Sequence, residues 1–264
     1  IIAAMAGVLF TACENGDRDF PDFKYSAVYF AYQSPIRTIT LGEDPSVDNS
    51  LDNEHKCQIM ATIAGVYENK KNVEIGIRVD NSLCDGYTFE STKGDIMPLP
   101  TSHYTLSDDK IVIKKGQVLG GVTVNLTDAF FNDPKATELN YVIPVVMTGV
   151  QDADSILEGK PSVDTPDRVN KEDWEVQSKD YILYAVKYIS KYDSHYLRRG
   201  VDTYTGNKTG TEVRHAANVE KDETIGGFST LGLNKVQWER PTKDAAGKNV
   251  EANLIPVSYT HLRA

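Results

Sequence analysis

Alternation of apolar with polar or small residues restricts the fold of this 264-residue chain more than any other feature. In Val73–Val79, apolar residues are separated by Glu74, Gly76 and Arg78. Side chains two residues apart lie on the same face of a β-strand, so this segment has one apolar face. Further segments with strand character are residues 29–32, 59–63, 104–106, 111–113, 122–126 and 141–147. About seven strands, separated by Gly, Asn, Asp and Pro turns, predict an all-β fold with an immunoglobulin-like β-sandwich.

Composition divides the chain into two β-rich parts. Residues 158–178 are rich in charged residues, Gly and Pro, which is typical of a linker. The sequence therefore predicts a β-sandwich domain over residues 25–157, a linker over 158–178 and a truncated second β domain over 179–255. The second domain would begin with the apolar strand 181–189.

Two local features refine this prediction. Residues 128–133 predict a single helical turn. Pro144 lies inside the apolar run 141–147. Because proline cannot donate a hydrogen bond to a neighbouring strand, Pro144 predicts either a bulge or a sheet edge.

The beginning of the chain has the pattern of an export signal. Residues 1–12 are apolar or small and precede Cys13, after which residues 14–19 are polar and mostly acidic. This run is shorter than the roughly 20 residues of a membrane-spanning helix, but it matches the apolar part of a signal peptide. It resembles the lipobox of bacterial lipoproteins, whose cysteine is acylated, with Phe10 where Leu is usual. We expect a signal-peptide remnant at 1–12 and a lipidated acidic tether at 13–24; the alternative is a buried N-terminal strand.

Charge and motifs exclude several classes of function. The net charge of −10 argues against a nucleic-acid partner, because an acidic chain repels phosphates. The sequence contains no zinc-type Cys and His spacing, hydrolase motif or phosphate-binding loop, so we predict no catalytic residue, metal or cofactor. With Cys13 acylated, Cys57 and Cys84 are left as either buried thiols or a disulfide, and both alternatives stay open.

The last residues of the chain break the preceding pattern. Residues 256–264 resemble the translation of a sequencing-library adapter. We therefore expect a non-native tail there and give it no functional weight.

Several separated blocks resemble one known family. They are residues 47–53, 61–67, 79–83, 99–104, 114–116 and 125–131. In this order they resemble an N-terminal domain-of-unknown-function family of surface lipoproteins from Sus-type, starch-utilisation-like glycan loci. Residues 180–200 are similar to the β-barrel-like (lipocalin-like) domain that often follows. The resemblance implies a cell-surface protein that binds or presents glycans beside an outer-membrane transporter, and it brings no catalytic residues.

Aromatic residues in the second half of the chain are candidates for contact with sugars. Tyr and Trp offer a flat apolar ring together with a polar group, which suits a half-wet site. The alternation around Tyr184 and Tyr188 favours a core role for both. The candidate glycan-binding residues, for which a core role is an equal alternative, are Trp174, Tyr192, Tyr196, Arg198 and Trp238.

These features predict a lipid-anchored protein of the outer membrane, exposed at the cell surface. It would bind an oligosaccharide or polysaccharide as a non-enzymatic accessory of a Sus-type uptake system, in complex with a transporter. Two alternatives stay open. One is the N-terminal part of a surface endo-glycosidase whose catalytic domain is missing, and the other is a structural or adhesin-like surface protein.

The lipobox generates the first testable prediction. Cys13→Ala removes the acylated side chain, so the protein should move from the membrane fraction to the soluble fraction, because acyl chains supply the anchoring free energy. Fractionation followed by immunoblotting measures this. Retention of the variant in the membrane fraction would contradict acylation at Cys13.

Overall fold

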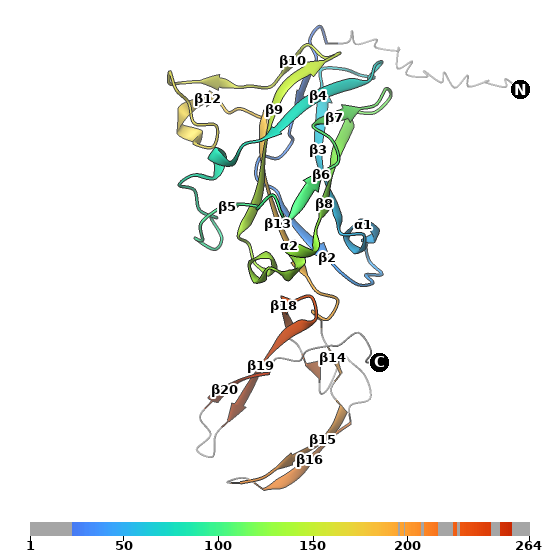
Figure 1. The fold of residues 1–264 in the computed structure, drawn as a ribbon, viewed down its shortest axis with the longest axis vertical. Helices are drawn as coiled ribbons and strands as arrows, with labels where there is room; N and C mark the ends of the chain where they lie inside the picture. The colour runs from blue at the N-terminus through green and yellow to red at the C-terminus, as the bar shows by residue number, and fades with distance from the viewer. Residues whose placement is uncertain are drawn as a thin grey trace, which may run out of the picture.

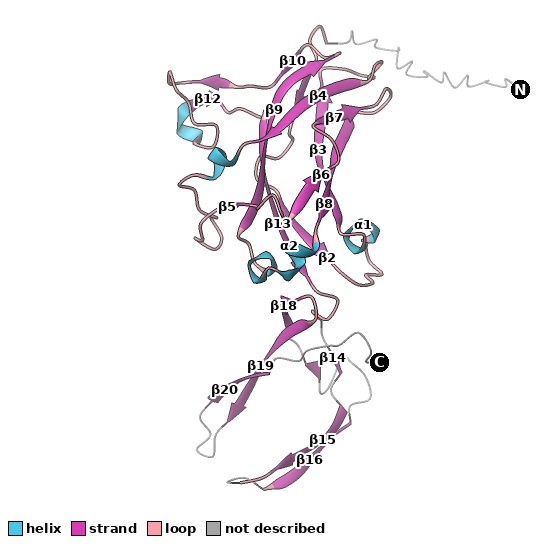
Figure 2. Ribbon diagram, in the orientation of Figure 1, coloured by secondary structure: helices cyan, strands magenta, loops and turns pink. Residues whose placement is uncertain are grey.

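The computed structural model describes residues 23–194, 196–197, 199–206, 209–215, 224–225, 228–243 and 249–254. Cys13, Arg198 and the tail 256–264 lie outside these residues. The described chain is built mostly of β-strands with a few short helices, which confirms the all-β prediction (Figure 2).

Two sheets form the larger unit of the molecule (Figure 1). The first has the order β10 (Ser155–Ile156), β1 (Ala27–Tyr29), β3 (Lys56–Ala64), β8 (Leu119–Leu126) and β6 (Tyr104–Leu106). The second has the order β2 (Ile36–Thr40), β13 (Tyr181–Ile189), β9 (Tyr141–Gln151), β4 (Val73–Val79) and β7 (Lys110–Ile113), with β5 (Met97–Pro98) beside β9. The main core lies between them and contains the alternating residues of both sheets, among them Ile59, Val122, Ile75 and Ile143.

The outer face of the second sheet is also covered. Leu83 and Phe89, from the segment that follows β4, pack against Val142 and Leu183 on β9 and β13. Both of these strands are therefore buried on two faces. This explains why their sequences are continuous apolar runs rather than alternating ones.

The short helices lie in the loops. They are α1 (Ser50–Asn53), η1 (Asn81–Cys84), α2 (Asp128–Asn132), η2 (Pro134–Thr137) and η3 (Lys171–Asp173). α2 is the single turn that the sequence predicts. Within the part of the chain that the structure describes, no helix is long and apolar enough to cross a membrane.

Pro144 lies in the interior of the second sheet, which corrects the prediction for this residue. β9 runs between β13 and β4, so it is not an edge strand, and its bulge lies at Thr148, between the pairs Gly76–Gly149 and Ile77–Met147. The Pro144 carbonyl accepts the N–H of Asp80 at 2.9 Å. Since β4 ends at Val79, the missing N–H of Pro144 falls where the neighbouring strand stops.

β13 belongs to the sandwich, which corrects the predicted boundary at residue 179. It pairs antiparallel with β9 and parallel with β2, so it is an interior strand of the second sheet. Tyr184 and Tyr188 point into the main core, as expected. Without β13, the strand β2 would have no partner in this sheet, because β2 pairs with β13 alone. Residues 158–178, predicted as a linker, contain η3 and a hairpin of β11 (Lys160–Pro161) and β12 (Trp174–Val176).

The second unit follows β13 and lies at one end of the sandwich (Figure 1). It contains the pair β14 (Tyr196–Leu197) and β17 (Thr224–Ile225), the pair β15 (Arg199–Tyr204) and β16 (Gly210–His215), and the sheet β18 (Phe228–Gly232), β19 (Lys235–Lys243) and β20 (Asn249–Leu254). Leu233 packs against the core of the sandwich. The Thr230 hydroxyl donates to the Asp193 carboxylate at 2.8 Å and accepts the Ser190 N–H at 2.9 Å. These contacts tie the two units together.

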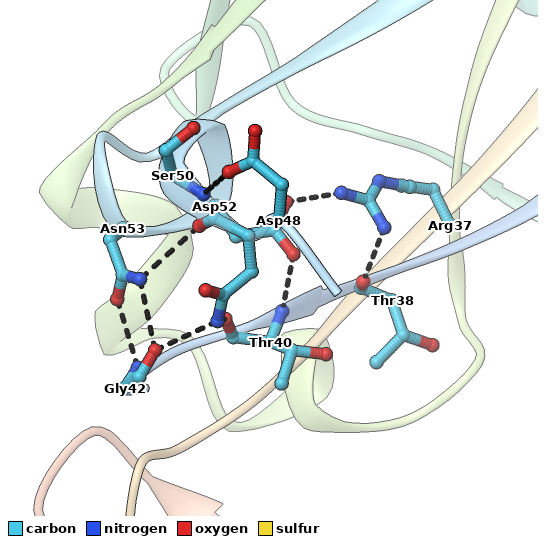
Figure 3. Close-up of polar contacts among 9 residues, drawn as sticks. Arg37, Thr38, Thr40, Gly42, Asp48, Ser50, Asp52 and Asn53 are labelled. Atoms are coloured by element: carbon cyan, nitrogen blue, oxygen red, sulfur yellow. Dashed lines mark hydrogen bonds and ion pairs between the residues drawn. The ribbon is translucent and has the colours of Figure 1, made fainter. Parts of the chain in front are cut away.

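Asp52 is a buried carboxylate in α1, which lies at the end of the sandwich next to the second unit (Figure 1). Figure 3 shows its polar contacts. Its side chain is 2% exposed, forms an ion pair with the Arg37 guanidinium and accepts the Thr40 N–H at 2.9 Å. The Asn53 amide donates to the Gly42 carbonyl at 2.9 Å. Together these contacts hold the connection from β2 to α1 against the sheet.

The burial of Asp52 generates the second prediction. Asp52→Ala leaves Arg37 and the Thr40 N–H without their acceptor, so the free energy of unfolding should fall by about 2–3 kcal/mol. Urea denaturation measures the change. The matched control is Glu54→Ala, which removes the exposed ion pair with Lys56 and should cost less than about 1 kcal/mol. Equal losses for the two variants would contradict a structural role specific to Asp52.

Candidate functional site

The structure places the candidate glycan-binding residues in two separate regions of the molecule. Trp174 lies in β12, at the end of the sandwich far from the second unit (Figure 1). Tyr192 lies in the turn after β13, next to that unit. Tyr196 lies in β14 and Trp238 in β19. Trp174 is therefore set apart from the other three, and a single site cannot contain all of them.

Trp174 is half-buried and held by its indole N–H. The Nε1 atom donates to the backbone oxygen of Asp167 at 2.7 Å. The Asp167 carboxylate accepts the Tyr87 hydroxyl at 2.8 Å. Partial burial, and next this hydrogen bond, raise the pKa of Tyr87 to about 12, so the hydroxyl stays protonated as the donor. The Trp174 N–H is engaged within the protein, which leaves only its ring for apolar contact with a ligand.

A groove lies at the same end of the molecule and shares β12 with Trp174. Its cavity volume of about 640 Å³ is within the roughly 300–1,000 Å³ of typical ligand sites. The lining residues are Tyr25, Thr148, Gly149, Val150, Ser155, Ile156, Leu157, Glu158, Gly159, Lys160 and Val176. These residues come from the start of β1, the end of β9 and the β10–β11–β12 segment, so the sheet register brings distant parts of the sequence together.

Two glycines allow the backbone to approach closely enough to form the groove. Gly65 has φ +79°, and a Cβ there would lie 2.1 Å from the backbone carbonyl oxygen of Tyr25. Gly159 also has φ +79°, and a Cβ there would lie 2.4 Å from the Val176 oxygen. Both positions require glycine, because a side chain would clash and the left-handed backbone is unfavourable for other residues.

Hydrogen bonds hold one edge of the groove in place. The Asp154 carboxylate accepts both the N–H and the hydroxyl of Ser26, each at 2.7 Å. These two bonds, the backbone one first, lower the pKa of Asp154. β10 pairs with β1 in parallel register, Ala27 opposite Ser155. The chain around Tyr25 is thus fixed to the segment that forms the opposite wall.

The groove presents the chemical groups that sugars require. Tyr25 is 60% exposed and offers an aromatic ring, and Val176 is 59% exposed. Ser155 and Thr148 supply hydroxyls, and Glu158 supplies a carboxylate. An aromatic ring packs against the C–H face of a pyranose, while hydroxyls and carboxylates bind its hydroxyl groups. The sequence alone does not identify Tyr25 as a residue of the site, because a single exposed tyrosine before a strand follows no recognisable pattern.

A cluster of Ser, His and Asp, the residue types of a catalytic triad, lies outside the groove. The Ser102 hydroxyl is 3.0 Å from His103 Nδ1, and His103 Nε2 is 3.1 Å from the Asp133 carboxylate. Asp133 also accepts the Tyr141 hydroxyl at 2.6 Å and the Lys135 N–H at 2.9 Å. Asp133 therefore caps η2 and fixes the start of β9. The groove lies at the other end of β9, about 30 Å away at about 3.3 Å per residue.

The described part of the chain contains two of the three cysteines. Cys57 and Cys84 are free and buried, so the disulfide alternative is wrong. Burial raises the pKa of each thiol to about 11, which keeps both protonated and unreactive near neutral pH. Among the described residues, no group of three or more His, Cys, Asp or Glu could hold a metal ion.

Comparisons with known proteins identify relatives of both units. A family model described as an N-terminal domain matches residues 23–154, and that of DUF5627, a domain of unknown function, matches residues 191–256. A crystal structure of a Bacteroides ovatus protein of unknown function is 44% identical with a TM-score of 0.85, covering 90% of this chain and 76% of that chain. DUF5627 begins directly after β13, in agreement with the place of this strand in the sandwich. No curated protein matches the chain.

Two further structures are more distant. A proposed carbohydrate binding protein from Bacteroides ovatus is 17% identical with a TM-score of 0.36, covering 69% of this chain and 43% of that chain. An auxiliary nutrient binding protein from Bacteroides thetaiotaomicron is 12% identical with a TM-score of 0.39, covering 80% of this chain and 61% of that chain. At these TM-scores the superpositions define neither a shared fold nor a shared ligand.

The hydrogen bonds of the Asp133 carboxylate lead to the third prediction, which concerns stability as a function of pH. Partial burial acts to raise the pKa of Asp133, but the bonds from Tyr141, Lys135 and His103 outweigh it and lower the pKa. A lowered pKa in the folded state stabilises the protein above the usual value of about 3.9, and this stabilisation is lost as the pH falls through the folded-state value. Asp133→Asn should therefore lower the free energy of unfolding by about 1 kcal/mol at neutral pH, with the difference shrinking below about pH 4.

Urea denaturation across this pH range measures the effect. The control is Asp128→Asn, which changes an exposed carboxylate on the adjacent helix α2. A difference between wild type and Asp133→Asn that stays constant down to low pH would contradict the prediction.

Proposed function

This chain belongs to the family whose N-terminal domain model matches residues 23–154, and we propose that it is a non-catalytic glycan-binding protein of the bacterial cell surface. In this proposal, acylated Cys13 holds the protein on the outer membrane, and the groove at Tyr25 binds an oligosaccharide or polysaccharide for a Sus-type transporter. The groove is the observation that carries the proposal.

The composition of the groove supports a sugar ligand over a purely apolar one. An exposed aromatic ring, two hydroxyl side chains and a carboxylate line the same cavity as Leu157 and Val176. Both apolar side chains are partly exposed, Leu157 at 37% and Val176 at 59%. A pyranose has matching surfaces, with a C–H face for the apolar groups and hydroxyls for the polar ones. The open shape of the groove suits a segment of a longer chain, whose ends can leave the site.

The position of the groove fits an accessory of a membrane transporter. Tyr25 follows Cys13 by twelve residues, so an extended tether reaches at most about 40 Å at about 3.3–3.6 Å per residue. β10 and β12, which contribute residues to the groove, lie at the end of the sandwich opposite β18, and the described chain begins at that same end (Figure 1). With Cys13 acylated, a bound glycan would stay close to the membrane surface, where a transporter could accept it.

The groove generates the fourth prediction. Tyr25→Ala removes the stacking surface and should weaken glycan binding about tenfold, which corresponds to about 1.4 kcal/mol. Gly149→Trp should abolish binding by filling the groove, since a Cβ at Gly149 meets no atom within 4 Å and the variant can fold. A glycan array on the purified protein identifies ligands, and calorimetry on the best of them measures the two variants.

Controls separate loss of the site from loss of the fold. Tyr32→Ala changes a tyrosine that is 77% exposed and does not line the groove, so it should bind normally. Trp174→Ala tests whether the neighbouring ring extends the site, with weaker binding and an intact fold expected. Mass spectrometry should recover the glycan uncleaved. Binding that is unaffected by both Tyr25→Ala and Gly149→Trp, or no binding to any oligosaccharide, would overturn the proposal.

A further inference from the structure

We propose that the groove at Tyr25 selects sugars by charge: amino-sugar chains bind most tightly, neutral chains less tightly and acidic chains most weakly. This inference rests on the proposed function, because it defines the ligand class of the same groove. It is carried by a carboxylate in the groove that has no cationic partner among the described residues, while the lysine of the groove is already neutralised.

Glu158 is the groove carboxylate that has no cationic partner among the described residues. It lines the groove and is exposed. Its backbone N–H donates to the Ile156 oxygen at 2.9 Å, which fixes the chain at this point. Within the part of the chain that the structure describes, no hydrogen bond or ion pair engages the Glu158 carboxylate. The carboxylate is therefore available to a ligand at no cost in broken protein contacts.

Lys160 is the only lysine or arginine among the residues that line this groove, and it is paired. Its ammonium group forms an ion pair with the Glu175 carboxylate, across the β11–β12 hairpin. At the rim, Asp154 accepts two hydrogen bonds from Ser26 and keeps its negative charge. Lys71, whose positive charge acts on Asp154, is itself paired with the Asp152 carboxylate at 3.0 Å. With both cations paired and the Glu158 and Asp154 carboxylates carrying charge, the local potential in the groove is negative.

This potential distinguishes sugars that are otherwise alike. An ammonium group on the sugar would be attracted to Glu158, and a sugar carboxylate or sulfate would be repelled by it. Because the groups are exposed, each difference in affinity should be only about threefold to fivefold. Salt screens interactions between exposed charges, so the differences should shrink as ionic strength rises.

Three probes with one backbone test the ordering. They are the β-1,4-linked hexamers of glucose, glucosamine and glucuronic acid, titrated by calorimetry at about pH 6, where most of the sugar amines carry a proton. Gly149→Trp shows which part of the binding occurs in the groove. We expect dissociation constants that increase from glucosamine to glucose to glucuronic acid, with the spacing reduced at high salt.

Two charge variants make the test specific. Glu158→Gln removes the carboxylate inside the groove but leaves Asp154 at the rim, so the ratio of the glucosamine and glucose dissociation constants should move most of the way toward one. Glu175→Gln frees Lys160 and should instead improve binding of the glucuronic acid hexamer. Glu54→Gln, at the far end of the sandwich, is the control for a general change in net charge and should leave every ratio as in the wild type.

The outcomes distinguish this inference from the proposed function. Equal affinity for the three hexamers, tighter binding of the acidic hexamer, or a preference that is as large after Glu158→Gln as before would overturn charge selection while glycan binding stands. If none of the three occupies the groove, charge selection for amino sugars is overturned, and the glycan array separately decides whether the groove binds another glycan. Ordered binding that responds to both charge variants supports the inference.

Discussion

The pairing of β13 with β9 is the interaction on which the rest of the structure depends. It joins residues 141–146 to residues 181–186 in antiparallel register at the centre of the second sheet. Both strands are buried on two faces, against the main core and against Leu83 and Phe89 outside. Because the two strands are neighbours, the chain between them must leave the sheet and return to it. That excursion carries β10, β11 and β12, and it supplies most of the groove.

Much of the fold could be predicted from the sequence, because alternation reports directly on which face of a strand is buried. The segment Val73–Val79 and the turn at α2 are examples, as are the core positions of Tyr184 and Tyr188. The boundary at residue 179 was wrong for a physical reason. A polar stretch such as residues 158–178 has the composition of a linker, whether it joins two domains or covers one of them.

The groove was harder to predict than the fold. Tyr25, Gly149, Glu158 and Val176 lie far apart in the sequence, and each is ordinary in its local context. They come together because β1 pairs with β10 and because β9 carries a bulge at Thr148, beside Gly149. Local patterns identify aromatic residues such as Trp174, but they do not report which of these residues share a cavity. That information lies in the strand register, which depends on contacts between distant segments.

The contacts between the two units fix which end of the sandwich lies next to the second unit. Leu233 packs against the sandwich core, and Thr230 bonds to both Asp193 and Ser190, so β18 is held at the end opposite the groove. An anchor at Cys13 would therefore keep the sandwich, with its groove, nearer the membrane than the DUF5627 unit. If Cys13 is acylated as proposed, the groove is where a chain handed on to a membrane protein would be held, and the second unit would extend into the medium.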